Sequence, residues 1–372
     1  MRFPEFSGEW KMCTIGELTT KVGSGVTPRG GEAVYKTEGH PFVRSQNVGL
    51  GNLLLDDIAF IDEETHLRQK STELQFNDVL LNITGASIGR SALVDKQIVG
   101  GNVNQHVCII RTKENLVPSF ICSFLLSNYG QRQIDSFQAG GNRQGLNFEQ
   151  IKSIKITIPS KDEQIKIAKL LRAIDERIAT QNKIIDKLQS LIKGLRVCCM
   201  QRNGSDNVYL SEIAQIYQPQ TISSAELTED GFLVYGANGI IGKYKDYNHK
   251  TEQICITCRG NTCGMVNYTK PMSWITGNAM VINTDKYQDK VYKKYLYHYL
   301  SAYNFNSIIS GSGQPQIVRT PLEKLKITLP TISEQKQKAI IFDKIQDKID
   351  INHKVLNLYI GQKQYLLRQM FI

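Results

Sequence analysis

The chain has 372 residues and a formal net charge of +10, from 45 lysines and arginines against 35 aspartates and glutamates. Hydrophobic residues make up 41% of the chain and charged residues 22%, which excludes wholesale disorder. The 29 glycines and 10 prolines are too few for a collagen-like chain. The length predicts two or three domains, and the positive charge favours a polyanionic partner, with nucleic acid first.

The sequence gives no sign of export or of a membrane span. Residues 1–12 contain no apolar core of a signal peptide. The charge-free stretch from Asn115 to Gln131 contains Pro118 and several polar residues, whereas a spanning helix needs ~20 apolar residues. We therefore expect a cytoplasmic protein whose eight cysteines are thiols.

The predicted elements follow one plan twice. Each copy has an irregular β-rich region, a short amphipathic helix (118–137, then 291–309), a Gly-rich loop, a strand that ends at a proline, and a long helix. We place the first β-rich domain at 1–160 and its long helix at 161–203. The second domain then occupies 204–332, and the second long helix 333–372.

An internal duplication supports this division. Residues 140–175 align with residues 311–346 without a gap. Further upstream, 84–89 align with 259–264, and the correspondence is looser. A repeat this long predicts two tandem domains, because solenoid repeats recur every ~20–50 residues.

Each long helix carries a heptad seam, with apolar residues spaced alternately four and three apart. We predict that the two helices pair as an antiparallel coiled coil, in which the polar interruptions Gln181 and Asn352 meet. The alternative is that each helix packs only on its own domain. The residues expected to pair are Leu171, Ile174, Ile178, Gln181, Ile185 and Leu188 in the first helix, and Phe342, Ile345, Ile349, Asn352, Leu356 and Tyr359 in the second.

Two lysines interrupt the second seam, since Lys338 and Lys363 replace Ile167 and Ile192 of the first. We expect the helix ends there to splay, to face a partner, or to cover apolar surface with their lysine stems. Helices of ~38 residues are ~57 Å long, so the pair is expected to hold the two domains a fixed distance apart.

Two unlike copies of one fold, each followed by a long helix, resemble the specificity subunit of type I restriction-modification systems. The best-matching residues are Pro159 with Glu163-Gln164, Pro330 with Glu334-Gln335, and the segment from Tyr235 to Tyr244. The resemblance covers essentially the whole chain. It implies an α+β fold with two tandem β-rich target-recognition domains, and helices that set the spacing and dock two methyltransferase subunits.

By this resemblance the chain is a non-catalytic subunit that reads a bipartite, asymmetric double-stranded DNA target, one half-site per domain. Its partners are two methyltransferase subunits, with restriction and translocase subunits in the full complex. S-adenosylmethionine, ATP and Mg²⁺ belong to those partners, and this chain binds no cofactor. Two alternatives stay open: the specificity subunit of a fused methyltransferase-nuclease, and a basic DNA-binding or adaptor protein without sequence preference.

Other chemistry finds little support. Cys255-x-x-Cys258, with Cys263 and His249 nearby, has no second cysteine pair to complete a zinc site, so buried thiols are favoured. Gly236 to Tyr244 lacks the spacing of a phosphate-binding loop, and no G-x-G-x-x-G motif follows a strand. Acidic pairs such as Asp56-Asp57 are expected to be solvated. We therefore predict neither catalytic nor metal-binding residues.

Base readout needs Arg, Lys, Asn or Gln on loops that can enter a groove, and phosphate contacts need basic, hydroxyl or backbone N–H groups. Three loops in each copy have this composition. The alternative for any one of these residues is a hydrogen bond that stabilises its loop. The predicted DNA contacts are Arg44, Gln46, Asn47, Thr84, Ser87, Arg90, Asn142, Arg143 and Gln144 in the first copy, and Asn238, Lys243, Tyr244, Arg259, Asn261, Thr262, Gln314 and Gln316 in the second.

Overall fold

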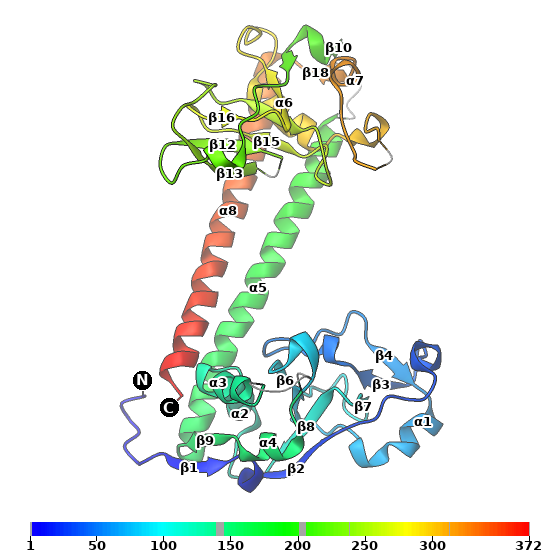
Figure 1. Ribbon diagram of the computed structural model, residues 1–372, viewed down its shortest axis with the longest axis vertical. Helices are drawn as coiled ribbons and strands as arrows, with labels where there is room; N and C mark the ends of the chain where they lie inside the picture. Colours follow the sequence, from blue (N-terminus) through cyan, green and yellow to red (C-terminus); the bar gives the residue numbers. More distant parts are fainter. Residues whose placement is uncertain (1, 139–144, 201–205, 238, 312, 372) are drawn as a thin grey trace. The chain divides into compact units, whose positions relative to one another are not determined.

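The structure is a computed structural model that describes residues 2–138, 145–200, 206–237, 239–311 and 313–371 (Figure 1). The chain forms two compact units. Unit 1 contains residues 1–182 and 354–372, and unit 2 contains residues 183–353. Each long helix therefore contributes one half to each unit. Among the described residues, no helix is long and apolar enough to cross a membrane.

Unit 1 has a mixed α and β fold that ends in the first long helix. Its strands are β1 (Lys11–Thr14), β2 (Thr19–Ser24), β3 (His40–Val43), β4 (Ala59–Ile61), β5 (Val79–Asn82), β6 (Ser91–Leu93), β7 (Asn102–Val103), β8 (Val107–Thr112) and β9 (Lys155–Ile158). Its helices are α1 (Glu63–Arg68), α2 (Pro118–Leu125), α3 (Asn128–Ser136), α4 (Phe148–Ser153) and the first part of α5 (Lys161–Met200).

Unit 2 repeats this plan with fewer residues. Its strands are β10 (Asp206–Tyr209), β11 (Gln215–Tyr217), β12 (Phe232–Gly236), β13 (Gly239–Tyr244), β14 (Ile254–Thr257), β15 (Val266–Tyr268), β16 (Trp274–Ile275), β17 (Ala279–Asn283) and β18 (Lys326–Leu329). Its helices are the last part of α5, then α6 (Lys293–Ser301), α7 (Arg319–Glu323) and the first part of α8 (Ile332–Gln369), whose last part belongs to unit 1.

The sheets of the two units match strand for strand. The four-stranded sheets have the orders β2-β8-β5-β6 and β11-β17-β14-β15, and the three-stranded sheets β4-β3-β7 and β13-β12-β16. In each unit the first strand pairs with the last, β1 with β9 and β10 with β18, in antiparallel register. In the three-stranded sheets, β3 runs parallel to β7 and β12 parallel to β16. The tandem α+β duplication predicted from the sequence is confirmed.

In each four-stranded sheet one inner strand, β5 in unit 1 and β14 in unit 2, is buried on both faces. In β5, Val79 and Leu81 face one hydrophobic cluster while Leu80 faces another. In β14, Ile254 and Ile256 face one cluster and Cys255 the other. A strand covered on both sides needs a continuous apolar run, which is why these strands show no polar alternation in the sequence.

The repeated Glu-Gln pair joins the start of each long helix to its unit. The side chain of Gln164 accepts from the backbone N–H of Val117 at 2.9 Å and donates to the carbonyls of Asn115 and Pro159, each at 3.1 Å. Gln335 accepts from Tyr292 at 2.8 Å and donates to Lys290 and Pro330, at 3.1 and 2.9 Å. Both glutamines are 1% exposed, so the motif satisfies the same buried backbone groups in both copies.

The helix predicted over 118–137 is wrong in one respect, because the structure has two helices there, α2 and α3. Ser127 ends the first and caps the second: its hydroxyl donates to the Phe124 carbonyl at 2.6 Å and accepts from the Gly130 N–H at 3.3 Å. A Cβ on Gly130 would lie 2.4 Å from the Phe124 carbonyl oxygen, so only glycine permits this turn. The predicted helix over 291–309 is likewise shorter, as α6 followed by a 3₁₀ turn at Phe305–Ser307.

The predicted pairing of the long helices is confirmed. In unit 1, Asp175 and Arg177 of α5 meet Lys363 and Tyr359 of α8 respectively, an order that makes the helices antiparallel. In unit 2, the apolar seam is one cluster of Leu188, Ile192 and Leu195 with Phe342, Ile345 and Ile349. Among the other predicted pairing residues, Leu171, Ile174, Gln181 and Ile185 are buried, and Ile178, Asn352, Leu356 and Tyr359 are half-buried.

The two seam lysines differ in what they do. Lys363 does not splay the helices, because its ammonium pairs with the Asp175 carboxylate at 2.6 Å and contacts the Leu50 carbonyl at 3.3 Å. At the other end of α8, Ala339 is buried and Lys338 only half-buried. The predicted meeting of Gln181 with Asn352 and the fixed spacing of the two domains stay predictions.

Candidate nucleic-acid interface

In unit 1 the structure brings the first two predicted DNA-contacting loops, and the edge of the third, together at the end of strand β5. The side chain of Asn82 donates to the Ser45 carbonyl at 2.8 Å, which joins the first loop to the sheet. Thr84 of the second loop forms a β-bridge with Gly145, at the edge of the third. The backbone N–H of Leu146 donates to the Ile83 carbonyl at 2.8 Å and fixes this contact.

Unit 2 assembles its loops in the same way at the end of strand β14. The hydroxyls of Thr257 and Thr262 both donate to the Ala237 carbonyl, which joins the second loop to the first. Arg259 forms a β-bridge with Gln316 of the third loop. The N–H of Ile317 donates to the Cys258 carbonyl at 3.0 Å, in the position that Leu146 and Ile83 occupy in unit 1.

The first loop of unit 1 is organised around Asp57. Its carboxylate accepts hydrogen bonds from Gln46 and, at 2.8 Å, from Asn47. Arg44 donates to the Asp57 carbonyl at 2.6 Å and lies over the Tyr35 ring, 5.4 Å from its centroid. Asp57 thus fixes the two long polar side chains of this loop, Arg44 and Gln46.

Burial separates the predicted contacts of this loop. Asn47 is fully buried, and its amide also donates to the Leu54 carbonyl and accepts from the Arg44 N–H, each at 2.9 Å. Gln46 is exposed, whereas Arg44 is half-buried, with a side chain 17% exposed. Asn47 therefore shapes the loop, and Gln46 is the residue best placed to touch a ligand.

The predicted contacts in the second loop of unit 1 differ in their exposure to solvent. Thr84 is half-buried, and its hydroxyl is 2.7 Å from Nδ1 of His106. Ser87 is half-buried and accepts from Asn82 at 3.1 Å, whereas Arg90 is exposed. The predicted contacts of the third loop, Asn142, Arg143 and Gln144, lie outside the described residues.

In unit 2 the predicted contacts are mostly exposed. Arg259, Asn261, Gln314 and Gln316 are exposed, and Thr262 is half-buried. Half-buried Lys243 lies 3.5 Å from the Asp230 carboxylate. The remaining two are Tyr244, which packs edge-on against Trp274 with ring centroids 5.0 Å apart, and Asn238, which lies outside the described residues.

Three residues of this interface escaped the sequence analysis. Asp57 was expected to be solvated, and neither Asn82 nor Thr257 belongs to a recognisable motif. Only the comparison of the two copies could have indicated Asn82 and Thr257, because both are polar residues that end otherwise apolar strands at equivalent positions of the duplication.

The cysteines of the C-x-x-C segment lie inside the fold. Cys255 is fully buried in β14, and burial raises the pKa of its thiol to about 12. Cys258 is 2% exposed and directs its sulfur at the Gly277 carbonyl, 3.7 Å away. Among the described residues, no group of three or more His, Cys, Asp or Glu is arranged to hold a metal ion.

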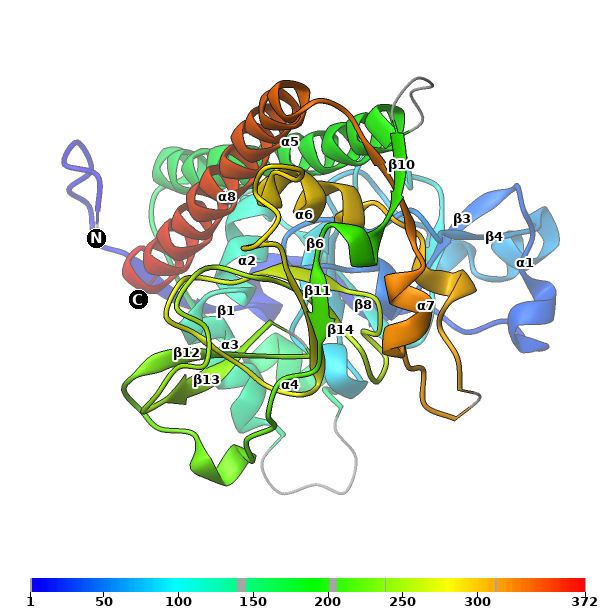
Figure 2. The ribbon, with the colours of Figure 1, turned by 90° about the horizontal axis from the view of Figure 1, so that it is seen from above.

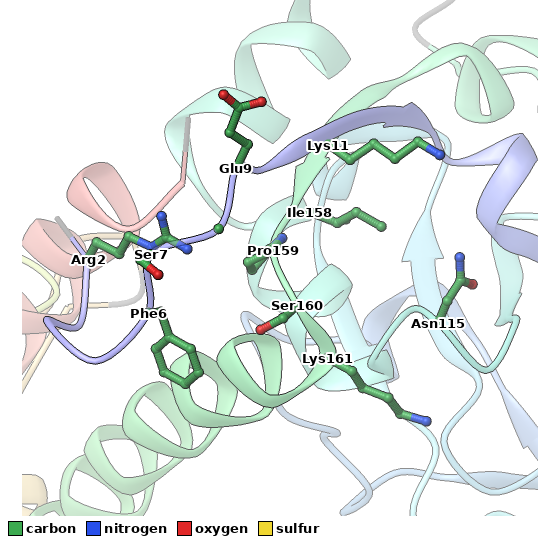
Figure 3. A pocket seen from close by; sticks show the side chains of 11 residues that line it. Arg2, Phe6, Ser7, Glu9, Lys11, Asn115, Ile158, Pro159, Ser160 and Lys161 are labelled. Atoms are coloured by element: carbon green, nitrogen blue, oxygen red, sulfur yellow. The ribbon is translucent and has the colours of Figure 1, made fainter.

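A cavity of about 470 Å³ lies at the start of α5, away from the loops described above (Figure 3). The N-terminal segment crosses it, and the Arg2 guanidinium forms two hydrogen bonds of 2.8–2.9 Å with the buried Glu163 carboxylate. Its lining contains none of the predicted DNA contacts: Arg2, Phe6, Ser7, Gly8, Glu9, Lys11, Asn115, Ile158, Pro159, Ser160 and Lys161.

Comparison with known proteins relates both halves of the chain to one family. The family model described as type I restriction modification DNA specificity domain matches residues 7–190 and again 203–358. The MjaVIII type I restriction enzyme specificity subunit of Methanocaldococcus jannaschii is 24% identical over 407 residues, covering 95% of this chain and 89% of the relative.

Two solved structures have the same fold. The S subunit of a type I restriction-modification system from M. genitalium matches with a TM-score of 0.68 at 17% identity, over 100% of this chain and 97% of that one. A chain from a structural study of complex assembly and conformational transition in the type I R-M system matches with a TM-score of 0.60 at 16% identity, over 98% and 97%.

Proposed function

Because this chain belongs to the family of type I restriction-modification DNA specificity proteins, we propose that it reads a bipartite, asymmetric DNA target, with one half-site for each unit. It is the recognition subunit of such a system and not an enzyme. The observation that carries the proposal is that the first and second loops, with the described edge of the third, meet at the end of one inner strand in both units.

The two loop sets differ at equivalent positions, which supports two different half-sites. Thr84 of unit 1 corresponds to Arg259 of unit 2, and Arg90 to Met265. Base edges in the major groove are distinguished by their donor and acceptor patterns. Loops with the same backbone plan but different side chains are therefore suited to different base sequences.

The proposed partners are double-stranded DNA, two methyltransferase subunits, and restriction and translocase subunits in the full complex. The net charge of +10 suits the phosphate backbone. Each unit also carries exposed apolar residues on α8: Leu358 and Tyr365 in unit 1, and Ile340, Ile341 and Ile351 in unit 2. Exposed apolar residues on a helix support its use as a docking surface for the methyltransferase subunits.

In this proposal the chemistry belongs to the partners, which use S-adenosylmethionine, ATP and Mg²⁺, and this chain supplies the target sequence. We place this work in the cytoplasm. The cysteines whose side chains the structure describes are thiols, which suits a reducing compartment.

The test is a genome-wide map of methylated bases in cells that carry the chain with the methyltransferase subunits of its system, and in cells from which the chain is deleted. We expect a split motif with a fixed gap that disappears on deletion. Unchanged methylation would overturn the function, and a continuous motif would overturn the assignment of one half-site to each unit.

A matched pair of variants tests whether the second loop of unit 1 takes part in recognition. Arg90→Ala removes an exposed cation from the second loop of unit 1, and Arg68→Ala removes one from α1, where Arg68 is 74% exposed and pairs with Glu64. We expect Arg90→Ala to weaken methylation of the split motif and Arg68→Ala to leave it unchanged.

A further inference from the structure

A buried polar side chain is the last residue of one inner strand in each four-stranded sheet. Asn82 is the last residue of β5 and Thr257 the last residue of β14, and both are 0% exposed. The duplication places them at the same position, since both precede by two residues the aligned pair Thr84 and Arg259. The other residues of both strands are apolar.

These two side chains make the same connection with different chemistry. In unit 1, Asn82 donates to the Ser45 carbonyl at 2.8 Å and to the Ser87 hydroxyl at 3.1 Å. In unit 2, Thr257 donates to the Ala237 carbonyl, and the Thr262 hydroxyl reaches the same oxygen at 3.4 Å.

The acceptors are equivalent too. Ser45 lies two residues beyond Val43, which pairs with Val103, and Ala237 lies two residues beyond Tyr235, which pairs with Ile275 at the same point of the matching sheet. The alignment of 84–89 with 259–264 also places Ser87 on Thr262. Asn82 therefore bonds both loops in unit 1, whereas in unit 2 Thr257 bonds the first loop and Thr262 of the second loop reaches the same carbonyl itself.

The core alone does not require a polar residue here. Burying an amide or hydroxyl costs free energy unless it is hydrogen-bonded, and an apolar side chain would fill the space without that cost. In unit 1 part of the cost remains, because Oδ1 of Asn82 is buried without a hydrogen-bond partner among the described residues. What both copies retain is the bond to the first loop.

The bond acts on the loops that carry the predicted base contacts. Ser45 lies between Arg44 and Gln46, and Ser87 lies three residues before Arg90. Bidentate readout of a base requires side chains held within about 0.5 Å of the productive geometry. A shift of the first loop against the second would misplace these groups without removing any of them.

We propose that Asn82 and Thr257 are positioning residues for base readout, and that each fixes the first loop of its own unit against the strand end from which the second loop begins. Neither residue touches DNA. Each governs the preference for one half-site only, because its hydrogen bonds stay within one unit. The inference rests on the proposed function.

The experiment uses the full chain in complex with its methyltransferase subunits and selects binding sites from a pool of random double-stranded DNA. The variants Asn82→Leu and Thr257→Val keep the size of each side chain and remove the donor. We expect Asn82→Leu to reduce discrimination between bases in one half-site about tenfold and to leave the other unchanged. Thr257→Val has the opposite pattern, and Thr257→Ser restores the wild-type preference.

Each variant contains its own control, because the second half-site reports that the complex is folded and bound. A variant that changes both half-sites equally, or neither, would overturn the proposal. If Asn82→Leu prevents unit 1 from folding, Thr257→Val decides alone, since it removes a single hydroxyl. A wild-type complex that selects a continuous motif or none overturns the proposed function instead.

Discussion

Each unit contains the C-terminal end of one long helix, α8 in unit 1 and α5 in unit 2. The contacts that hold these two ends are apolar in unit 1 and polar in unit 2. In unit 1 the chain just beyond the end of α8 makes apolar contacts: Phe371 is 1% exposed, and its ring lies 5.2 Å from Phe120 and 6.0 Å from Phe124 of α2. In unit 2 the end of α5 is held by a polar chain in which Arg196 donates to His298 at 2.8 Å, and His298 donates to Asp343 at 2.9 Å. Figure 2 shows α6, which carries His298, beside both long helices.

The duplication makes this difference informative. When the ungapped alignment is continued along the long helices, Arg196 occupies the position of Leu367, and Asp343 that of Arg172. An arginine in the place of Leu367, which is 9% exposed, would be buried without its carboxylate, which is costly. The backbone plan was thus kept while the contacts diverged, so the two helix ends are no longer interchangeable.

The largest effect is expected at the contacts of Phe371 with α2, which we call the apolar anchor. Phe371→Ala leaves a cavity between α2 and the long helices and should lower the free energy of unfolding of unit 1 by about 3–5 kcal/mol. Trp10 reports this unit, because it packs against Phe120 at 6.4 Å. Urea unfolding is followed by Trp10 fluorescence in a Trp274→Phe background.

Tyr365→Ala is the matched control for Phe371→Ala. Tyr365 lies near the same end of α8 but is 47% exposed, so we expect a change within about 0.5 kcal/mol. Equal losses for the two variants would contradict the apolar anchor.

The hydrogen-bonded chain of Arg196, His298 and Asp343, which we call the polar anchor, should make the stability of unit 2 depend on pH. Burial lowers the pKa of His298 to about 4, and the neighbouring Arg196 cation acts in the same direction. Asp343, which accepts from His298, and Lys294, which pairs with Asp343 at 2.6 Å, complete its charged surroundings.

In the folded state His298 therefore stays neutral, whereas in the unfolded chain it takes up a proton below about pH 6.5. The unfolded state binds more protons between pH 6.5 and 4, so the free energy of unfolding should fall by about 2–3 kcal/mol as the pH is lowered through this window. Trp274 fluorescence in a Trp10→Phe background measures it. His298→Gln should reduce the dependence, and the part that survives is expected to come from His249, a buried histidine of the same unit whose pKa burial also lowers. A slope that His298→Gln leaves unchanged would contradict this role of His298.

The architecture was predictable because its signals are periodic. The heptad seam and the alignment of 140–175 with 311–346 are visible in the residue types, and they correctly indicated the two copies and the paired helices. The motif around Gln164 and Gln335 was also visible, although its purpose emerged only when both side chains proved to bond the same backbone groups. Burial on both sides explains the uninterrupted apolar runs of β5 and β14.

The anchors and the loop geometry were not predictable, because their partners lie far apart in sequence and follow no period. Arg196 and His298 are 102 residues apart, and Asn82 and Ser45 are 37 apart. Asp57 sits in an acidic loop of ordinary composition, yet it holds Arg44, Gln46 and Asn47. Composition singled out loops that the structure brings together at the ends of β5 and β14, but it could not separate the exposed Gln46 from the buried Asn47.

The smallest effect is expected at the seam, where the units differ again. Ile192 of unit 2 is 5% exposed, whereas unit 1 has Lys363 at the equivalent position, paired with the 39% exposed Asp175. Partly exposed ion pairs contribute little, and isoleucine fits an apolar seam, so Lys363→Ile should change the free energy of unfolding of unit 1 by less than about 1 kcal/mol. Urea unfolding followed by Trp10 fluorescence again measures this free energy. The single variant Asp175→Asn and the double variant Lys363→Ile/Asp175→Asn complete a double-mutant cycle for the ion pair. A loss above about 2 kcal/mol that the double variant fails to recover would show that the Lys363 contact with the Leu50 carbonyl matters more than the ion pair.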